Sequence, residues 1–202
     1  MLKENCLNEG MYNLSKVGNI VQLLIISICM FLIPLVVPTM LDAVFGAESV
    51  IATNSQYVVG ALVNTALITA ALAVKGWKNI IALVTVPSIS ALTSGLVLNI
   101  SSIFTVYMIP AIWLGNLAII YAIKYLYVKK NVNYIASAGL GIIVKAGLIF
   151  GGFNVLTLLV QMPAPVQAAL STAMGINQVI TAIIGSALAY GTVKLLYKNK
   201  EA

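Results

Sequence analysis

Six stretches of this chain are almost entirely apolar, and each is long enough to cross a lipid bilayer as a helix. They cover about residues 17–41, 57–74, 80–100, 104–128, 134–160 and 168–197. A membrane-spanning helix needs about 20 apolar residues. The stretches are continuous and do not alternate with a period of two, so they indicate helices and not barrel strands. We therefore predict an all-α, polytopic membrane protein in which residues 1–202 form a single six-transmembrane-helix bundle.

The composition excludes several classes of protein. Hydrophobic residues make up 61% of the chain and charged residues 8%, whereas soluble domains average about 45–50% and about 25%. The chain has no histidine, and its two cysteines, Cys6 and Cys29, are too far apart for a metal or redox motif. No pair of acids lies within the predicted spans. We therefore expect no enzyme activity, no catalytic residues, no cofactor and no bound metal.

The positive charges predict how the chain is oriented. Apart from Lys145, the lysines lie in the N-terminal tail, around Lys75 and Lys78, within residues 124–130 and from Lys194 onwards. In a six-span protein these places are all on one side of the membrane. The connections on the other side contain no lysine; they are residues 42–56, 101–103 and 161–167. The positive-inside rule then places both termini in the cytoplasm. The net charge of +6 follows from this pattern and does not indicate nucleic-acid binding.

Lys145 is the exception, because it lies about 18 Å into the fifth span, near the middle of the bilayer. A lysine at this depth costs about 2.5–3.5 kcal/mol on insertion scales, so it should face the bundle interior or a wet cavity. No acid in another span offers an ion pair. We interpret Lys145 as a ligand-binding residue. The alternative is a structural lysine that snorkels or bonds backbone carbonyls.

Other polar side chains are concentrated in the outer halves of the spans, which predicts a pocket open to the outside and closed below. With Lys145, the predicted substrate-binding residues are Asn64, Ser94, Trp113, Asn116, Asn154, Asn177 and Gln178. Hydrogen bonding between helices is the alternative for the amides, and an interfacial aromatic belt is the alternative for Trp113. Residues 42–56 are either a lid over this pocket or a plain solvated loop. The GxxxG spacing of Gly147 and Gly151, and the looser match of Gly185 and Ala189, predict close helix contacts, within the chain or with a partner.

Three stretches carry a resemblance to a known family. They are MIPAIWLGN in the fourth span, the glycine-rich fifth span with its lysine, and MPAPVQAALSTAMGINQVITAIIGSALAYG. Over about residues 55–195 they resemble the substrate-binding S components of energy-coupling factor (ECF) transporters. The nearest subset comprises small bacterial membrane proteins often mislabelled as iron hydrogenases. This chain has no cysteine cluster for an iron–sulfur centre, which excludes that activity.

The resemblance implies a subunit in a bacterial plasma membrane that captures a small, vitamin-like micronutrient from outside. It implies a pocket near the outer surface under the loop after the first helix, with Asn116 and Lys145 in binding roles. It also implies three partners: a transmembrane coupling subunit and two cytoplasmic ATPases. The first span lacks the Ala-xxx-Ala docking face of such proteins, so docking is expected elsewhere, with Ala66 and Ala70 as candidates. The alternatives are a structural or quinone-contacting subunit of a membrane complex, and a small exporter or channel.

The lysine pattern makes a topological prediction. With Cys6 and Cys29 replaced, a single cysteine at Trp77 should resist an impermeant thiol reagent in intact cells, because its turn is cytoplasmic. A single cysteine at Glu48 should be labelled, because residues 42–56 are outside. Strong labelling at position 77 would contradict the orientation.

Overall fold

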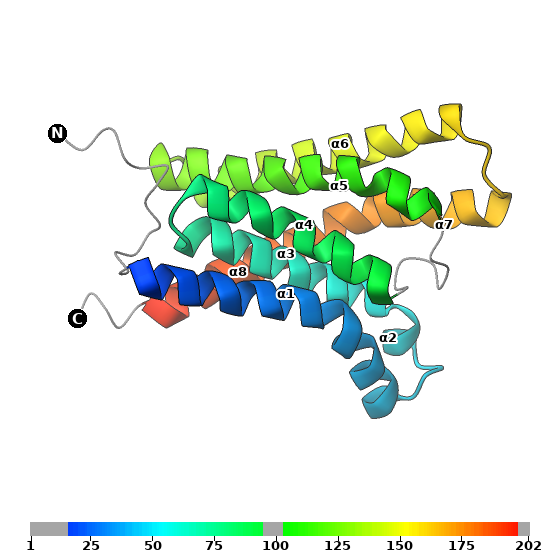
Figure 1. Ribbon diagram of the computed structural model, residues 1–202, viewed down its shortest axis with the longest axis horizontal. Helices are drawn as coiled ribbons and strands as arrows, with labels where there is room; N and C mark the ends of the chain where they lie inside the picture. Colours follow the sequence, from blue (N-terminus) through cyan, green and yellow to red (C-terminus); the bar gives the residue numbers. More distant parts are fainter. Residues whose placement is uncertain (1–15, 95–102, 198–202) are drawn as a thin grey trace.

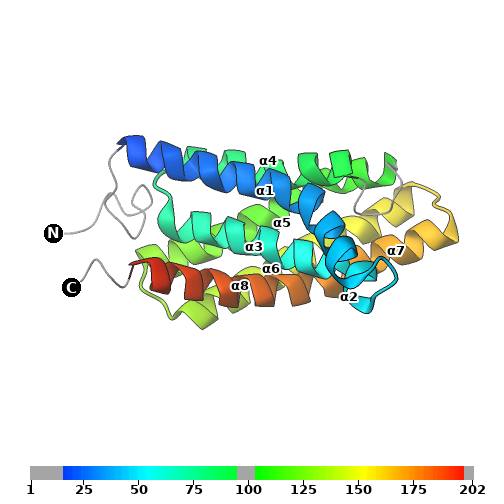
Figure 2. The ribbon, with the colours of Figure 1, turned by 90° about the horizontal axis from the view of Figure 1, so that it is seen from below.

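The computed structural model describes residues 16–94 and 103–197, and these residues fold almost entirely into helices. The helices are α1 (Lys16–Phe45), α2 (Val50–Thr53), α3 (Ser55–Ala73), α4 (Trp77–Ser94), α5 (Ile103–Tyr121), the π-helix η1 (Ala122–Lys129), α6 (Tyr134–Leu159), α7 (Ala164–Met174) and α8 (Ile176–Tyr197). The long helices lie side by side in an elongated bundle (Figures 1 and 2). The predicted all-helical class is thus present in the described residues.

Five helical segments are long and apolar enough to cross a membrane. They are Gly18–Phe45, Ser55–Ala73, Phe104–Lys129, Tyr134–Leu159 and Ala164–Leu195. The apolar part of α4 within the described residues is shorter, Ile80–Ser90. The predicted third span continues to residue 100, which lies outside the described residues. The structure therefore shows five candidate spans, and the sixth stays a prediction.

The ends of the bundle differ in charge. The start of α1, the α3–α4 turn, the η1–α6 connection and the end of α8 lie together at one end, whereas α2 and α7 lie at the other (Figure 1). The first end, here called the lysine end, carries Lys75, Lys129, Lys130 and Lys194. The connections that the sequence predicts to share one side of a membrane therefore share one end of the bundle.

A reciprocal pair of hydrogen bonds fixes the turn at the lysine end. The Asn19 side-chain amide donates to the Lys75 carbonyl at 3.2 Å, and the Lys75 backbone N–H donates to Asn19 Oδ1 at 2.7 Å. Gly76 follows with φ of +88°, a left-handed conformation that favours glycine. These contacts join the start of α1 to the α3–α4 turn.

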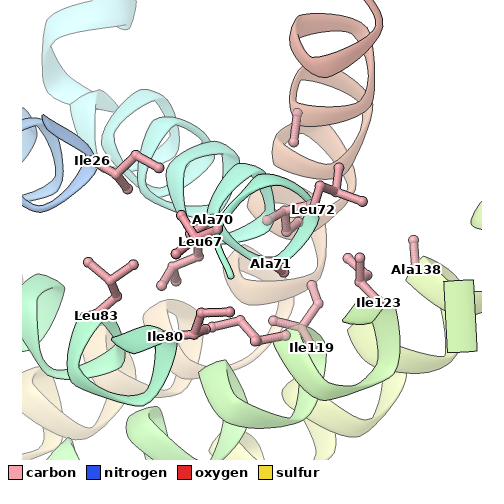
Figure 3. Close-up of a cluster of buried hydrophobic side chains, with 14 of the residues drawn as sticks. Ile26, Leu67, Ala70, Ala71, Leu72, Ile80, Leu83, Ile119, Ile123 and Ala138 are labelled. Carbon is pink, nitrogen blue, oxygen red and sulfur yellow. The ribbon is translucent and has the colours of Figure 1, made fainter. Parts of the chain in front are cut away.

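Two apolar clusters fill the bundle. The larger occupies the half near the lysine end, where side chains from α1, α3, α4, α5 and α6 point into one volume (Figure 3). The smaller lies between α5, α6 and α7 and contains Met108, Ile149, Phe153, Leu156, Leu170 and Met174. The most extensive helix pairs are α3 with α8 and α5 with α6. α1 is more peripheral and leaves apolar side chains exposed, as suits contact with lipid.

The predicted last span, residues 168–197, is two helices and not one. Helix α7 starts earlier than predicted, at Ala164, and ends at Met174. Gly175 has non-helical dihedral angles, φ −98° and ψ −110°, and α8 starts at Ile176. A Cβ at Gly175 would lie 2.7 Å from the Ser171 carbonyl oxygen. The position therefore suits glycine, and the helix breaks there.

The predicted GxxxG contact on α6 is not made inside the described part of this chain, where a Cβ added at Gly147 or Gly151 would meet nothing within 4 Å; a contact with a partner there stays a prediction. The close contact lies instead on α8. A Cβ at Gly185 would lie 2.5 Å from Asn64 Cβ and 2.9 Å from the Ala61 carbonyl oxygen. Gly185 therefore allows α8 to approach α3 closely, as small residues do in membrane helix pairs.

Two alanine substitutions test this packing. Gly185→Ala should destabilise the fold by about 1–3 kcal/mol, because the added methyl group overpacks the α3–α8 contact. The matched control, Gly147→Ala, should leave stability unchanged or raise it by up to about 1 kcal/mol, because alanine is the better helix former and the space is open. Thermal unfolding in detergent measures both. Equal stability of the two variants would contradict the assigned contact.

Candidate binding site

A cavity of about 150 Å³ lies inside the bundle, and α1, α3, α4, α5, α6, α7 and α8 contribute to its lining. It contains residues that the sequence predicts as substrate-binding: Asn64, Asn116, Lys145, Asn177 and Gln178. It also contains polar residues that are not among those predicted: Gln56, Ser88 and Thr181. The pocket is therefore shared by more helices than the outer-half pattern alone indicates.

The cavity is closed towards the lysine end and reaches the surface at the other. Asn64 lies at its inner level, and the next turns of α3 after it, from Leu67 onwards, belong to the large apolar cluster. Gln56, the second residue of α3, lines the cavity and is exposed close to α2. From Asn64 to Gln56 the helical rise is about 12 Å. The cavity thus extends from the middle of the bundle to the end that carries α2.

A chain of hydrogen bonds links three helices at the floor of this cavity. The Lys145 ammonium on α6 donates to Asn64 Oδ1 on α3. Asn64 Nδ2 donates to the Gly60 carbonyl at 2.9 Å and to Thr181 Oγ1 on α8 at 3.3 Å. Thr181 Oγ1 in turn donates to the Asn177 carbonyl at 2.7 Å. Asn64 is therefore oriented by its own helix and by α8, and its oxygen faces the ammonium.

Lys145 keeps unused hydrogen-bonding capacity. It is 2% exposed, and an ammonium group carries three N–H donors. Within residues 16–94 and 103–197 its one acceptor is Asn64, and the acids there, Asp42 and Glu48, are both exposed. A buried charge without an opposite charge is costly unless something else compensates it. The arrangement favours water or a ligand in the cavity.

Asn177 is a second unsatisfied group in the cavity wall. It is 6% exposed, and neither Nδ2 nor Oδ1 has a hydrogen-bond partner among the described residues. Asn116 is 3% exposed and makes no side-chain hydrogen bond within the same part of the chain. Native proteins pair most of their buried polar atoms, so these groups make the cavity a candidate binding site. Gln178 differs, because its Nε2 donates to the Ala173 carbonyl at 3.0 Å across the helix break.

Two predicted residues lie outside this cavity. Asn154 is exposed, and its Nδ2 donates to the Phe150 carbonyl of its own helix at 2.8 Å. It follows Lys145 by nine residues, and at about 100° per residue nine residues place it on the opposite face of α6. Trp113 packs against the large apolar cluster, and its Nε1 donates to Ser88 Oγ at 3.2 Å. Trp113 therefore contacts Ser88, which lines the cavity, but does not line the cavity itself. The side chain of Ser94 lies outside the described part of the structure.

A second buried lysine has a different role. Lys124 is fully buried, and its ammonium donates to the Val74 carbonyl at 2.7 Å and the Ala71 carbonyl at 3.4 Å. These carbonyls belong to the C-terminal end of α3, where helical carbonyls lack intrahelical donors and favour a cation. The sequence places Lys124 at the end of a span, and the structure adds that it caps a neighbouring helix.

The chemistry of the cavity suits binding. Its polar lining consists of one ammonium group, amides and hydroxyls. The described residues contain no group of three or more His, Cys, Asp and Glu that could hold a metal ion. Comparison of the chain with protein-family models, with curated proteins and with solved structures finds no match.

The two buried lysines give a matched stability test. Lys124→Met should destabilise the fold by about 1–3 kcal/mol, because the terminal carbonyls of α3 lose their donor inside the bundle. Lys145→Met should change stability by less, because it removes an uncompensated charge and leaves Asn64 facing a cavity that can hold water. Thermal unfolding of both variants in one detergent measures the difference. A larger loss for Lys145→Met would show that this lysine is structural.

Proposed function

We propose that this chain is the substrate-binding S subunit of an ECF-type importer that captures a small micronutrient. The observation that carries the proposal is Lys145, a buried ammonium without a counter-charge among the described residues, in a cavity with unsatisfied amides. Ionisable groups within membrane spans are expensive, and they mark substrate or ion pathways. A substrate that accepts a hydrogen bond from Lys145 supplies the missing interaction.

The shape of the cavity supports capture from one side. It reaches the surface at the end without lysine, and the large apolar cluster closes it towards the lysine end. If the positive-inside rule holds here, the opening faces the outside and both termini lie in the cytoplasm of a bacterial cell. A channel would need polar lining through the full depth, and the apolar cluster interrupts it.

The partners follow from the same proposal. The polar groups of the cavity can bind a solute but supply no energy for its transport. We assign that role to a transmembrane coupling subunit and two cytoplasmic ATPases, so the chain itself is not an enzyme. The docking face expected at Ala66 and Ala70 is wrong, because Ala70 is fully buried and Ala66 packs against the large apolar cluster. The exposed apolar side chains of the peripheral α1 and of the other helices leave surface for a coupling subunit and for lipid.

Ligand-induced stabilisation tests the capture function. A panel of vitamins added to the purified protein should include a compound that raises the unfolding temperature. At a concentration a hundredfold above its dissociation constant, a bound compound adds about 2.7 kcal/mol to the free energy of unfolding. Lys145→Met should weaken that binding by about 1.5–3 kcal/mol, the scale of a hydrogen bond to a charged group. Asn154→Leu, on the opposite face of α6, is the control and should bind normally.

Two results would contradict the proposal. If no solute stabilises the protein, the alternative of a structural or quinone-contacting subunit is favoured. If a solute binds but the tagged protein never co-purifies with ATPases from its own cells, the capture function stands and the importer assignment fails.

A further inference from the structure

The break between α7 and α8 lies in the wall of the cavity. Ala173 and Met174 at the end of α7 line it, and so do Asn177 and Gln178 in the first turn of α8. The first turn of a helix has backbone N–H groups without intrahelical acceptors and carries partial positive charge. Gln178 bonds the Ala173 carbonyl on the α7 side of the break. The cavity is therefore bordered by the N-terminal end of α8 and by the C-terminal end of α7, whose partial charges have opposite signs.

The full charge in the cavity is that of Lys145. Lys145 reaches the same space from α6, and the residues that line the cavity include no acid. An ammonium group favours an anion. A ligand that balances this charge carries an anionic group.

Asn177 adds a requirement of its own. Its donor and its acceptor are both buried and unpaired among the described residues. A planar group with an N–H next to a C=O, such as a lactam or a ureide, satisfies both atoms at once. Asn177 lies one helical turn from Thr181 of the floor, a rise of about 6 Å.

The volume of the cavity limits the size of the ligand. About 150 Å³ is the size of an engineered protein cavity that binds benzene. Apolar side chains, including Val63, Ile112 and Met174, complete the lining and suit the faces of a ring. The space therefore fits one small ring with a short substituent.

We propose that the captured ligand is a small carboxylic acid that also carries a planar lactam or ureide group; this inference rests on the capture function proposed above. The carboxylate contacts the Lys145 ammonium at the floor. The lactam or ureide edge pairs with the side-chain amide of Asn177. The carboxylate uses the N–H donors that Lys145 has besides the one bonded to Asn64, and the lactam or ureide pairs the two Asn177 atoms that the described residues leave without a partner.

Four ring compounds of similar size separate these two requirements. Orotate carries both the carboxylate and the ureide, orotamide replaces the carboxylate by a neutral amide, uracil lacks the substituent, and benzoate lacks the ureide. Added to the full-length protein in lipid nanodiscs, orotate should bind about 10- to 100-fold more tightly than each of the other three. Calorimetry measures affinity, and thermal unfolding measures stabilisation.

Variants assign each preference to a residue. Lys145→Met should abolish the preference for orotate over orotamide, and Asn177→Leu should abolish the preference for orotate over benzoate. Asn154→Leu, which lies on the opposite face of α6, should keep both preferences. Without any ligand, Asn177→Leu should raise the unfolding temperature, because it removes two buried atoms that lack partners.

The outcomes distinguish this inference from the proposed function. Stabilisation by orotamide or uracil but not by orotate overturns the acid assignment and leaves solute capture standing. Equal binding of orotate and benzoate, or a fall in ligand-free stability for Asn177→Leu, overturns the role of Asn177. Binding of orotate by a protein that never associates with ATPases leaves the acid site standing and overturns the importer. If none of the four compounds binds, the inference is overturned, and the wider vitamin panel then tests whether the protein captures a solute at all.

Discussion

The hydrogen bonds from Lys145 through Asn64 and Thr181 to the Asn177 carbonyl organise this bundle, because they are polar contacts in a place without bulk water. Inside a protein or a bilayer, a polar group without a partner costs more than it does at a surface. The network joins α6, α3 and α8 at one level. The close approach at Gly185 brings α8 to Asn64, so apolar packing and polar pairing depend on the same two helices.

Much of the fold and part of the site could be predicted from the sequence, because their causes are strong and local. A bilayer requires long apolar segments whose backbones are paired internally, so the helices follow from composition. A lysine in the middle of such a segment raises the free energy of membrane insertion, so it is expected to have a function, and this identifies Lys145. Its meeting with Asn116 in one cavity follows from matching depths on two antiparallel spans. Whether this cavity binds a substrate stays a prediction.

The remaining features depend on direction around a helix axis and on contacts between distant residues. Depth alone places Asn154 near the site, but its angular position turns it away from Lys145. The spacing of Gly147 and Gly151 is that of a helix contact, yet within the described residues no atom lies within 4 Å of a Cβ placed at either position. The helix break at Gly175 and the capping role of Lys124 both require knowledge of which elements are neighbours. One sequence does not contain that information explicitly.

The helices of this bundle differ in length, and that has a consequence for its position in a bilayer. α3 has 19 residues and a length of about 29 Å, close to the about 30 Å of a hydrocarbon core. The segment Ala164–Leu195 consists of α7 and most of α8 and has 32 residues, and its summed helical rise of about 48 Å exceeds this thickness. A long apolar segment beside a short one is accommodated by tilting of the bundle or by local thickening of the lipid. The cost is a fraction of a kcal/mol per ångström of mismatch between the apolar length and the bilayer. Membrane thickness therefore becomes a variable that sets how far the mouth of the cavity stands from the aqueous phase.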